Sequence, residues 1–481
     1  MSEGGGPVYN ETIFSEEGRI IDHSRSLTSG KISSQLFALA LPLLMGNILQ
    51  QLYNVVAAII VGQYLGKEAF AAIGIAGTVM NLFFFVLIGC CTGVSIILAS
   101  LFGRGDFHSL RKECFLAVVF GTGFTLFLSI FFTLLLSPLL KVINTPAEIF
   151  DYTWDYLIII LGGLLATFFY NLCAAALRAV GNTRYALFFL MIAVAVNVGL
   201  TFVLVALLDF GIVGAAWATV FSQGLSALLC MAYIKKKLPF LVPTREDMRY
   251  DGALLKKTIL FASLSAMHQS SLYIGKLLVQ GAVNLLGTVS IAAYTATARI
   301  EGVSLAVGES GSESVSVFVA QNTGAGNKKR ALEGFRLGFF SLASLGVAIS
   351  FILYLTAEQC VALFVGSGQT AAIAEGVSYM QLLSFFYVLS FIGSSFVGYY
   401  RGSGRINIPF IGTTLQLSVR VILSYWLAPS MGLKAVALAT GIGWIAIVTF
   451  QTTIFSCIRR RERTIGLPDT SVPPELAAKK L

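Results

Sequence analysis

Long apolar runs separated by short polar turns make up most of the chain. Runs such as "LFFFVLIGCCTGVSIILASLF" (82–102) and "YLIIILGGLLATFFYNLCAAAL" (156–177) reach the roughly 20 residues that a helix needs to cross the hydrocarbon core of a bilayer. Strands of a membrane barrel would instead alternate apolar and polar residues over about 10 positions. The pattern predicts an all-α polytopic membrane protein with twelve transmembrane helices, at residues 35–61, 71–101, 115–137, 154–177, 185–208, 213–234, 258–285, 291–320, 335–356, 377–400, 408–428 and 433–456.

The basic residues between these spans indicate an orientation. If the N-terminus lies inside, 27 of the 33 Lys and Arg residues fall in cytoplasmic segments, and only Lys67, Lys141 and Lys434 fall in outer loops. An excess of positive charge on one side is what the positive-inside rule describes. The first 30 residues lack the pattern of a cleaved signal peptide. We therefore expect a multi-pass protein of the plasma (cytoplasmic) membrane with both termini in the cytoplasm.

A short polar turn occurs twice in the chain. "LFGRGDFHSLR" (101–111) and "NTGAGNKKRAL" (322–332) lie 221 residues apart, and each follows a long apolar run. The same offset relates "YLGKEAFAAIG" (64–74) to "LLGTVSIAAYT" (285–295) and "GIVGAAWAT" (211–219) to "GLKAVALAT" (432–440). An offset of 223 relates "RAVGNTR" (178–184) to "RGSGRIN" (401–407). Four matches in register indicate an internal duplication.

Each half of the duplication holds six spans, so both halves enter the membrane in the same orientation. This predicts two six-helix lobes related by a parallel pseudo-two-fold repeat. The expected parts are a cytoplasmic N-terminal tail (1–33), an N-lobe (34–234), a cytoplasmic connector (235–257), a C-lobe (258–456) and a cytoplasmic C-terminal tail (457–481). Duplication for packing alone would explain the repeat equally well. Transport is favoured because a site between two repeats can be opened to either side by rocking them.

Composition narrows the function further. Hydrophobic residues make up 56% of the chain and charged residues 12%, about half the usual share of roughly 25%. The net charge of +9 marks the inner side of the membrane, so we expect no nucleic-acid partner. The seven cysteines have no metal-ligand spacing. No P-loop, His-Glu-x-x-His or Gly-x-Ser-x-Gly pattern is present, so we expect no enzyme and no cofactor.

Four further stretches resemble a known family. They are "LPLLMGNILQQLYNVVAAIIVGQYLGKEAFAAIG" (41–74), "ALRAVGNTR", "FGIVGAAWATVFSQ" (210–223) and "VFVAQNTGAGN" (317–327). They resemble the multidrug and toxic compound extrusion (MATE) family, and the likeness runs from about residue 33 to residue 456. The resemblance implies twelve helices in two lobes, a central cavity, and export of organic compounds in exchange for inward H⁺ or Na⁺. It also implies a monomer.

Polar residues inside the first half form one candidate group. Asn47, Gln50, Gln51 and Asn54 lie at spacings of three and four, which place Asn47, Asn54 and one of the glutamines on one helix face. Amide contacts that hold helices together would account for them equally well. Many prokaryotic MATE relatives have aspartates at the positions that match Ala57 and Thr201. This chain keeps Asn197 but lacks both carboxylates, which puts the family's N-lobe cation site in doubt.

The carboxylates lie in the second half instead. The eighth span contains Arg299, Glu301, Glu309 and Glu313, whereas the positions 221 residues earlier are Thr78, Met80, Ile88 and Thr92. These charges are therefore not part of the repeated scaffold, and ionisable groups at membrane depth are functional candidates by default. Glu309 and Glu313 share one helix face in the cytoplasmic half of the span. We expect them to bind H⁺, Na⁺ or an organic cation.

The seventh span carries a polar stripe with one positive charge. Gln269, Tyr273, Lys276, Gln280 and Asn284 follow one helix face, and His268 lies beside it. A static ion pair between Lys276 and a carboxylate on an adjacent helix is as plausible as a role in transport. Arg299 and Glu301 point to different faces, so each needs another partner, and Arg420 is an isolated cation expected to pair across helices.

These observations and the resemblance together favour an antiporter that exports cationic or amphiphilic small organic molecules, with the lipid bilayer as its other expected partner. Glu309, and with it Glu313, would alternate between coupling ion and substrate, with Lys276 and Arg299 tuning them. The alternative is a flippase or exporter for a lipid-linked precursor or an anionic metabolite, which Lys276, Arg299 and Arg420 would favour. A channel or receptor is disfavoured because rocking repeats have no obvious use there.

Overall fold

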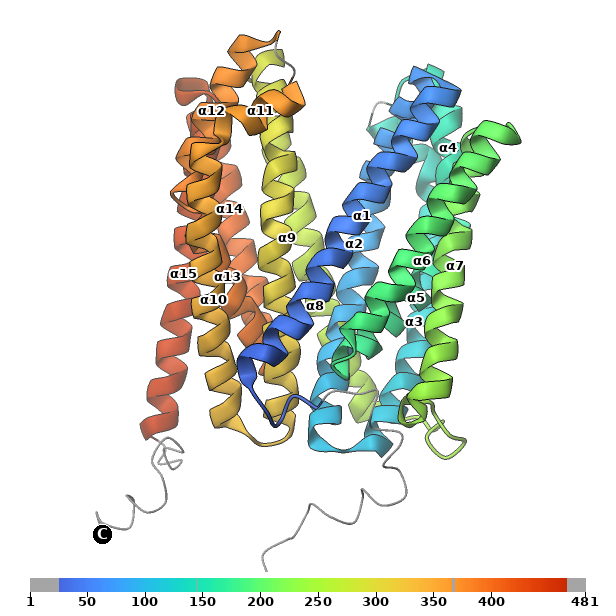
Figure 1. The fold of residues 1–481 in the computed structure, drawn as a ribbon, viewed down its shortest axis with the longest axis vertical. Helices are drawn as coiled ribbons and strands as arrows, with labels where there is room; N and C mark the ends of the chain where they lie inside the picture. Colours follow the sequence, from blue (N-terminus) through green and yellow to red (C-terminus); the bar gives the residue numbers. More distant parts are fainter. Residues whose placement is uncertain (1–25, 144, 366–367, 465–481) are drawn as a thin grey trace, which may run out of the picture.

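The computed structural model describes residues 26–143, 145–365 and 368–464, and these residues form helices and turns with no strand (Figure 1). The helices of the first half are α1 (Ile32–Leu65), α2 (Lys67–Arg104), α3 (Phe107–Val142), α4 (Ala147–Gly162), α5 (Leu164–Ala179), α6 (Thr183–Thr201), the π-helix η2 (Phe202–Leu207) and α7 (Gly211–Lys237). A 3₁₀ turn, η3 (Pro239–Leu241), follows. The second half contains α8 (Gly252–Asn284), α9 (Thr288–Gly324), α10 (Lys328–Leu355), α11 (Ala357–Val365), α12 (Thr370–Ser384), α13 (Tyr387–Gly402), α14 (Asn407–Met431) and α15 (Leu433–Thr464).

The twelve predicted spans all correspond to helices. By length and apolar composition, eight helices of the described chain qualify as membrane spans. The pairs α4–α5 and α12–α13 add one span each, although each pair bends, by 51° and 52°. The remaining two, α8 and α9, are 33 and 37 residues long but more polar, and α9 holds the four charges singled out above. The prediction of a multi-pass all-α membrane protein is confirmed, whereas the two bends, η2 and α11 were not predicted.

The two lobes join at one end of the molecule. Both ends of the described chain lie at this end, here called the termini side, and the ribbons of the lobes diverge toward the opposite, distal side (Figure 1). One hydrophobic cluster contains N-lobe residues such as Leu98 and Leu110 together with Phe318 and Phe335 of the C-lobe. The second cluster belongs to the C-lobe alone. Apolar packing across the lobes is therefore concentrated at the termini side.

Backbone conformation supports the repeat. Each of the four matched stretches contains a glycine with positive φ in both copies: Gly66 and Gly287, Gly105 and Gly326, Gly181 and Gly404, and Gly211 and Gly432. Only glycine adopts this region without strain, which explains why these positions are shared. After the first turn, Asp106 accepts a hydrogen bond from the Ser109 N–H, and Asn327 accepts one from the Arg330 N–H at the matching place. The repeated turns are thus two copies of one helix-capping structure.

Candidate functional site

One face of α9 meets the N-lobe. The Asn47 side chain of α1 donates a hydrogen bond to the Ser310 hydroxyl of α9 over 3.0 Å. Three residues further along α9, an oxygen of Glu313 lies 3.7 Å from Nε of Arg178 in α5. Both contacts cross between lobes, so this face of α9 forms part of the interface. Asn47 therefore makes the amide contact between helices that its sequence position allowed.

Two arginines flank Glu313. Its second oxygen lies 4.0 Å from Arg401 of α13, and both arginines are mostly buried. Arg178 and Arg401 begin the matched stretches "RAVGNTR" and "RGSGRIN", so the repeat places one arginine in each lobe beside a carboxylate that has no counterpart in the N-lobe. Sequence analysis did not single out these arginines. Their shared position in a repeated motif was the signal that could have found them.

Glu309 differs from Glu313 in its surroundings. It lies one turn further toward the distal side on the same face of α9, its side chain is exposed, and it has no ion-pair partner among the residues that the structure describes. Ser310 and Glu313, which contact the N-lobe, follow Glu309 within about one helical turn, so Glu309 lies beside the interface face of α9. Of the two carboxylates that the sequence grouped together, Glu313 therefore has ion-pair partners and Glu309 has none among the described residues.

The polar stripe on α8 also faces the N-lobe. The Tyr273 hydroxyl donates to the Thr78 carbonyl of α2 over 2.7 Å, and its ring stacks on Phe85 with centroids 5.4 Å apart. Lys276, one turn further toward the distal side, is exposed and forms no ion pair within the described chain. The static ion pair of Lys276 with a carboxylate on an adjacent helix, one of the two alternatives that the sequence left open, is therefore absent among the described residues.

The other members of this group lie less centrally. Gln280 donates to Asn284 on the same helix over 2.9 Å, and Gln269 is half-buried. His268 is buried and turned toward α14, where its Nδ1 lies 3.3 Å from the Thr413 hydroxyl. A packed histidine, rather than a ligand in the space between the lobes, fits that position.

Glu301 and Arg420 form a pair inside the C-lobe. Both are buried, and an oxygen of Glu301 in α9 lies 4.0 Å from Arg420 in α14. The expectation that Arg420 pairs across helices is confirmed. Glu301, however, is enclosed within one lobe. Arg299 is exposed, and the described residues offer it no ion-pair partner.

The N-lobe holds a polar cluster without carboxylates. Asn197 donates from its amide to the hydroxyls of Thr219 and Ser222, both over 3.3 Å. Thr201 is buried one turn away, immediately before the π-helix η2, and such π segments often occur at functional sites. The Asn197 carbonyl oxygen and the Thr201 hydroxyl lack hydrogen-bond partners in the structure. Oxygens for a small cation or water are present there, but the described residues contain no cluster of His, Cys, Asp or Glu that could hold a metal.

The remaining candidates on α1 differ in exposure. Gln50 is half-buried and Gln51 is exposed. The side chain of Asn54 lies outside the described residues, so its predicted place on the Asn47 face stays a prediction.

Comparison with known proteins identifies the family. The MatE family profile matches residues 42–203 and again 265–426, one match in each lobe. The chain belongs to the MatE family. It is 27% identical over 431 residues to the probable multidrug resistance protein YpnP of Bacillus subtilis, which covers 87% of this chain and 93% of the relative. The probable multidrug resistance protein NorM of Thermotoga maritima is 25% identical, covering 88% and 91%.

Solved structures share the fold. An outward-facing multidrug resistance MATE family transporter superposes with a TM-score of 0.83 at 21% identity, over 90% of this chain and 98% of that one. A MOP superfamily transporter from Pyrococcus furiosus gives a TM-score of 0.81 at 21% identity, over 91% and 98%. The two-lobed architecture expected from the repeat is therefore the architecture of MATE transporters, and this MATE protein belongs to a family of membrane transporters.

Proposed function

We propose that this protein is a secondary antiporter that exports cationic or amphiphilic organic compounds in exchange for inward H⁺ or Na⁺. Both termini lie in the cytoplasm in this proposal, so the space between the lobes faces outward. The observation that carries the proposal is the exposed Glu309 carboxylate beside the interface face of α9, which has no ion-pair partner among the described residues. Two relatives of this chain are named as probable multidrug resistance proteins, which supports organic compounds as the substrates.

Glu309 supplies the coupling. A carboxylate in this position can hold H⁺, Na⁺ or the positive group of a substrate. A bound ion lowers the affinity for a cationic substrate, because the two positive charges repel. The reciprocal weakening follows from linkage between the two ligands. Tyr273 and Phe85, stacked across the lobes, offer an aromatic surface beside the charge, which suits flat amphiphilic molecules. No ATP-binding pattern was found in the sequence, so the ion gradient is the energy source.

Flux measurements in proteoliposomes test this proposal. With an imposed pH or Na⁺ gradient, wild-type protein should drive accumulation of a fluorescent organic cation, and the effective gradient identifies the ion. We expect Glu309→Gln to reduce gradient-driven flux at least roughly tenfold, the effect of losing about 1.4 kcal/mol of differential binding. Glu358→Gln, which removes an exposed carboxylate of α11, is the matched control. Undiminished coupled flux in Glu309→Gln would refute the assignment.

A second candidate function rests on the two exposed cations. Lys276 and Arg299 are unpaired among the described residues of the polar helices α8 and α9, and both could attract the phosphate of a lipid-linked precursor or an anionic metabolite. In that case lipid or anion movement would need no ion gradient and would fall in Lys276→Gln. Organic-cation flux that depends on the gradient and survives Lys276→Gln would favour the antiporter instead.

A further inference from the structure

The segment before α1, residues 26–31, crosses from one lobe to the other at the termini side and is called the strap here. The Leu27 N–H donates to the side-chain oxygen of Gln321 in α9 over 3.0 Å. The same amide donates from its nitrogen to the Ala179 carbonyl of α5 over 2.7 Å. The Leu27 carbonyl accepts from Asn322 over 3.2 Å and from Arg330 over 3.1 Å. Gln321 thus links the strap to both lobes.

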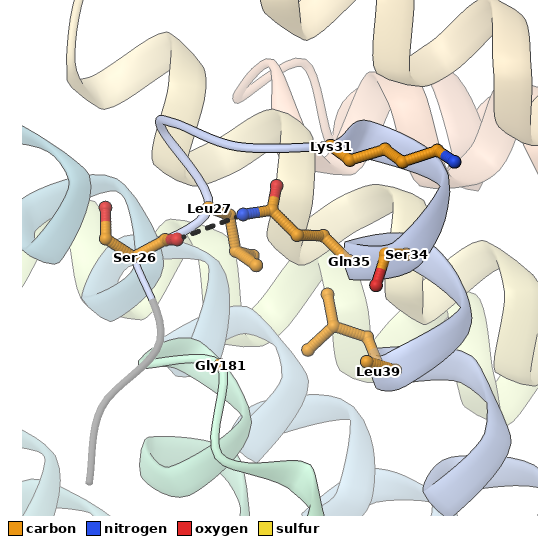
Figure 2. A pocket seen from close by; sticks show the side chains of 8 residues that line it. Ser26, Leu27, Lys31, Ser34, Gln35, Leu39 and Gly181 are labelled. Atoms are coloured by element: carbon orange, nitrogen blue, oxygen red, sulfur yellow. Dashed lines mark hydrogen bonds between the residues drawn. The ribbon is translucent and has the colours of Figure 1, made fainter. Parts of the chain in front are cut away.

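Further bonds hold the remainder of the strap. Arg330 of α10 also donates to the Gly30 carbonyl and to Gln35 of α1, each over 2.8 Å. Gln35 in turn donates to the Ser29 carbonyl over 2.6 Å and to the Ser26 carbonyl over 3.2 Å. The bond to Ser26 is drawn in Figure 2. Between the strap and the start of α1 lies a pocket of about 340 Å³, lined by Ser26, Leu27, Lys31, Ser34, Gln35, Ala38, Leu39 and Gly181 (Figure 2).

Gln321 sits where the lobes approach most closely. A Cβ atom on Gly103 of α2 would collide with the Gln321 backbone, and one on Gly324 would collide with the Ser100 backbone. The repeat relates these two contacts, because residues 100 and 103 match residues 321 and 324 at the offset of 221. The close approach of the two backbones is therefore present in both copies of the repeat. The buried side-chain amide is not, because the N-lobe position that matches Gln321 is Ser100.

We infer that Gln321 is a positioning residue of the transport cycle, which acts through Leu27 and Ala179 to hold the termini side closed. Its two bonds join α9 to α5 and to the strap, so they cannot both persist when the lobes separate at this end. A buried side-chain amide that loses its hydrogen-bond partners has a larger free-energy penalty than an amide that is hydrated throughout. The bonds therefore stabilise the distally open state relative to the state open at the termini side.

A distance measurement across the termini side tests this inference. One spin label goes on the native, exposed Cys457 of α15 and the other on Lys236→Cys of α7, in full-length protein whose six other cysteines are replaced. These helices belong to opposite lobes (Figure 1). We expect Gln321→Leu to increase the ratio of long to short distances roughly tenfold, the effect of losing one or two buried hydrogen bonds. The readout requires no knowledge of substrate or ion, so it succeeds or fails independently of the proposed antiport.

Two further variants make the result decisive. Gln451 of α15 is equally buried, and its side-chain amide has no hydrogen-bond partner among the described residues. Gln451→Leu should therefore leave the distance distribution unchanged. Arg330→Gln releases the strap from α10 without altering the buried amide and should shift the distances in the same direction as Gln321→Leu. An unchanged distribution in Gln321→Leu overturns the inference. If Gln321→Leu does not fold, an unchanged distribution in Arg330→Gln overturns it in the same way.

Discussion

At the scale of single residues, Asp247 shows how one carboxylate fixes the connector to the N-lobe. It is buried and accepts hydrogen bonds from the Thr244 N–H over 3.0 Å and from the Thr244 hydroxyl and Arg111 over 2.6 Å each. His108 lies 2.7 Å away. Burial alone would raise the pKa of Asp247, but the hydrogen bonds from Thr244 and Arg111 outweigh it and hold the pKa well below its ordinary value.

Replacing Asp247 tests this link. We expect Asp247→Asn to lower stability by about 2 kcal/mol, since it removes charge-assisted hydrogen bonds from a buried site. Because the pKa of the folded state is depressed, the contribution is complete above the ordinary value of 3.8 and is lost progressively as the pH falls from there toward the lower pKa of the folded state. Thermal unfolding in detergent between pH 3 and 7 should therefore show a difference between wild type and variant that shrinks at low pH. A constant difference would contradict the role of the charge.

The sequence identified the unusual residues better than their partners. Ionisable side chains inside a membrane carry a high free-energy cost, and for that reason the sequence singled out Glu301, Glu309 and Glu313. The structure places these three residues in three different environments. Their pairing depends on which faces of α9 meet α14, α5 or open space, and helix periodicity alone does not determine neighbours. Lys276 shows the same limit, because the pattern along its own helix does not tell that it lacks an ion-pair partner among the described residues.

At the scale of elements, the two bent spans use opposite solutions to the same packing problem. In the N-lobe, Gly163 lies between α4 and α5, and a Cβ there would collide with Val220 of α7. In the C-lobe, Phe386 lies between α12 and α13 and packs against Gly441 of α15, where a Cβ would lie 2.6 Å from the Phe386 ring. The repeat relates the two pairs, at offsets of 223 and 221. In the N-lobe the glycine lies at the bend and the large residue on the facing helix, and in the C-lobe the two are exchanged.

A swap experiment follows from this exchange. We expect Gly441→Val to lower stability by about 1–3 kcal/mol, because the added side chain overpacks the bend against the aromatic ring. The double variant Phe386→Gly and Gly441→Val copies the N-lobe pair and should recover at least half of the loss. Thermal melting in detergent measures both. If the double variant lost more stability than the two single variants lose together, the bends would not be equivalent.

The positions of the spans followed from apolar runs, but the bends did not. "YLIIILGGLLATFFYNLCAAAL" reads as one continuous helix because its glycine pair is compatible with either a straight or a bent span. Whether such a pair bends depends on the residue opposite, here Val220, which lies more than fifty positions away. In the C-lobe the bend falls at Phe385–Phe386, and nothing in that local sequence indicates it.

At the scale of the whole molecule, the repeat predicted the two lobes but not the state in which they are found. In the rocking cycle proposed above, both conformations contain the same helices, and the sequence specifies them equally well. The choice depends on contacts that are present in one state alone. Arg178 and Glu313 make such a contact, since they belong to different lobes and lie at the end where the lobes share a hydrophobic core.

The repeat itself supplies the control for testing that contact. Arg178 and Arg401 flank the same carboxylate, but Arg178 reaches Glu313 from the other lobe and Arg401 from the same lobe. We therefore expect Arg178→Gln to shift the equilibrium toward opening at the termini side by about 1 kcal/mol, the usual size for a partly exposed ion pair. Arg401→Gln should produce no such shift, because its pair moves with the C-lobe.

A double-mutant cycle would separate the ion pair from general effects of each substitution. If Arg178 acts through Glu313, then Arg178→Gln combined with Glu313→Gln should open the termini side no further than Arg178→Gln alone. The distance between labels on α7 and α15 measures all four states of the cycle. Additive effects of the two substitutions, or an equal shift in Arg401→Gln, would mean that Arg178 does not act through an ion pair with Glu313 across the lobes. The unrepeated carboxylate would then have no part in joining the lobes.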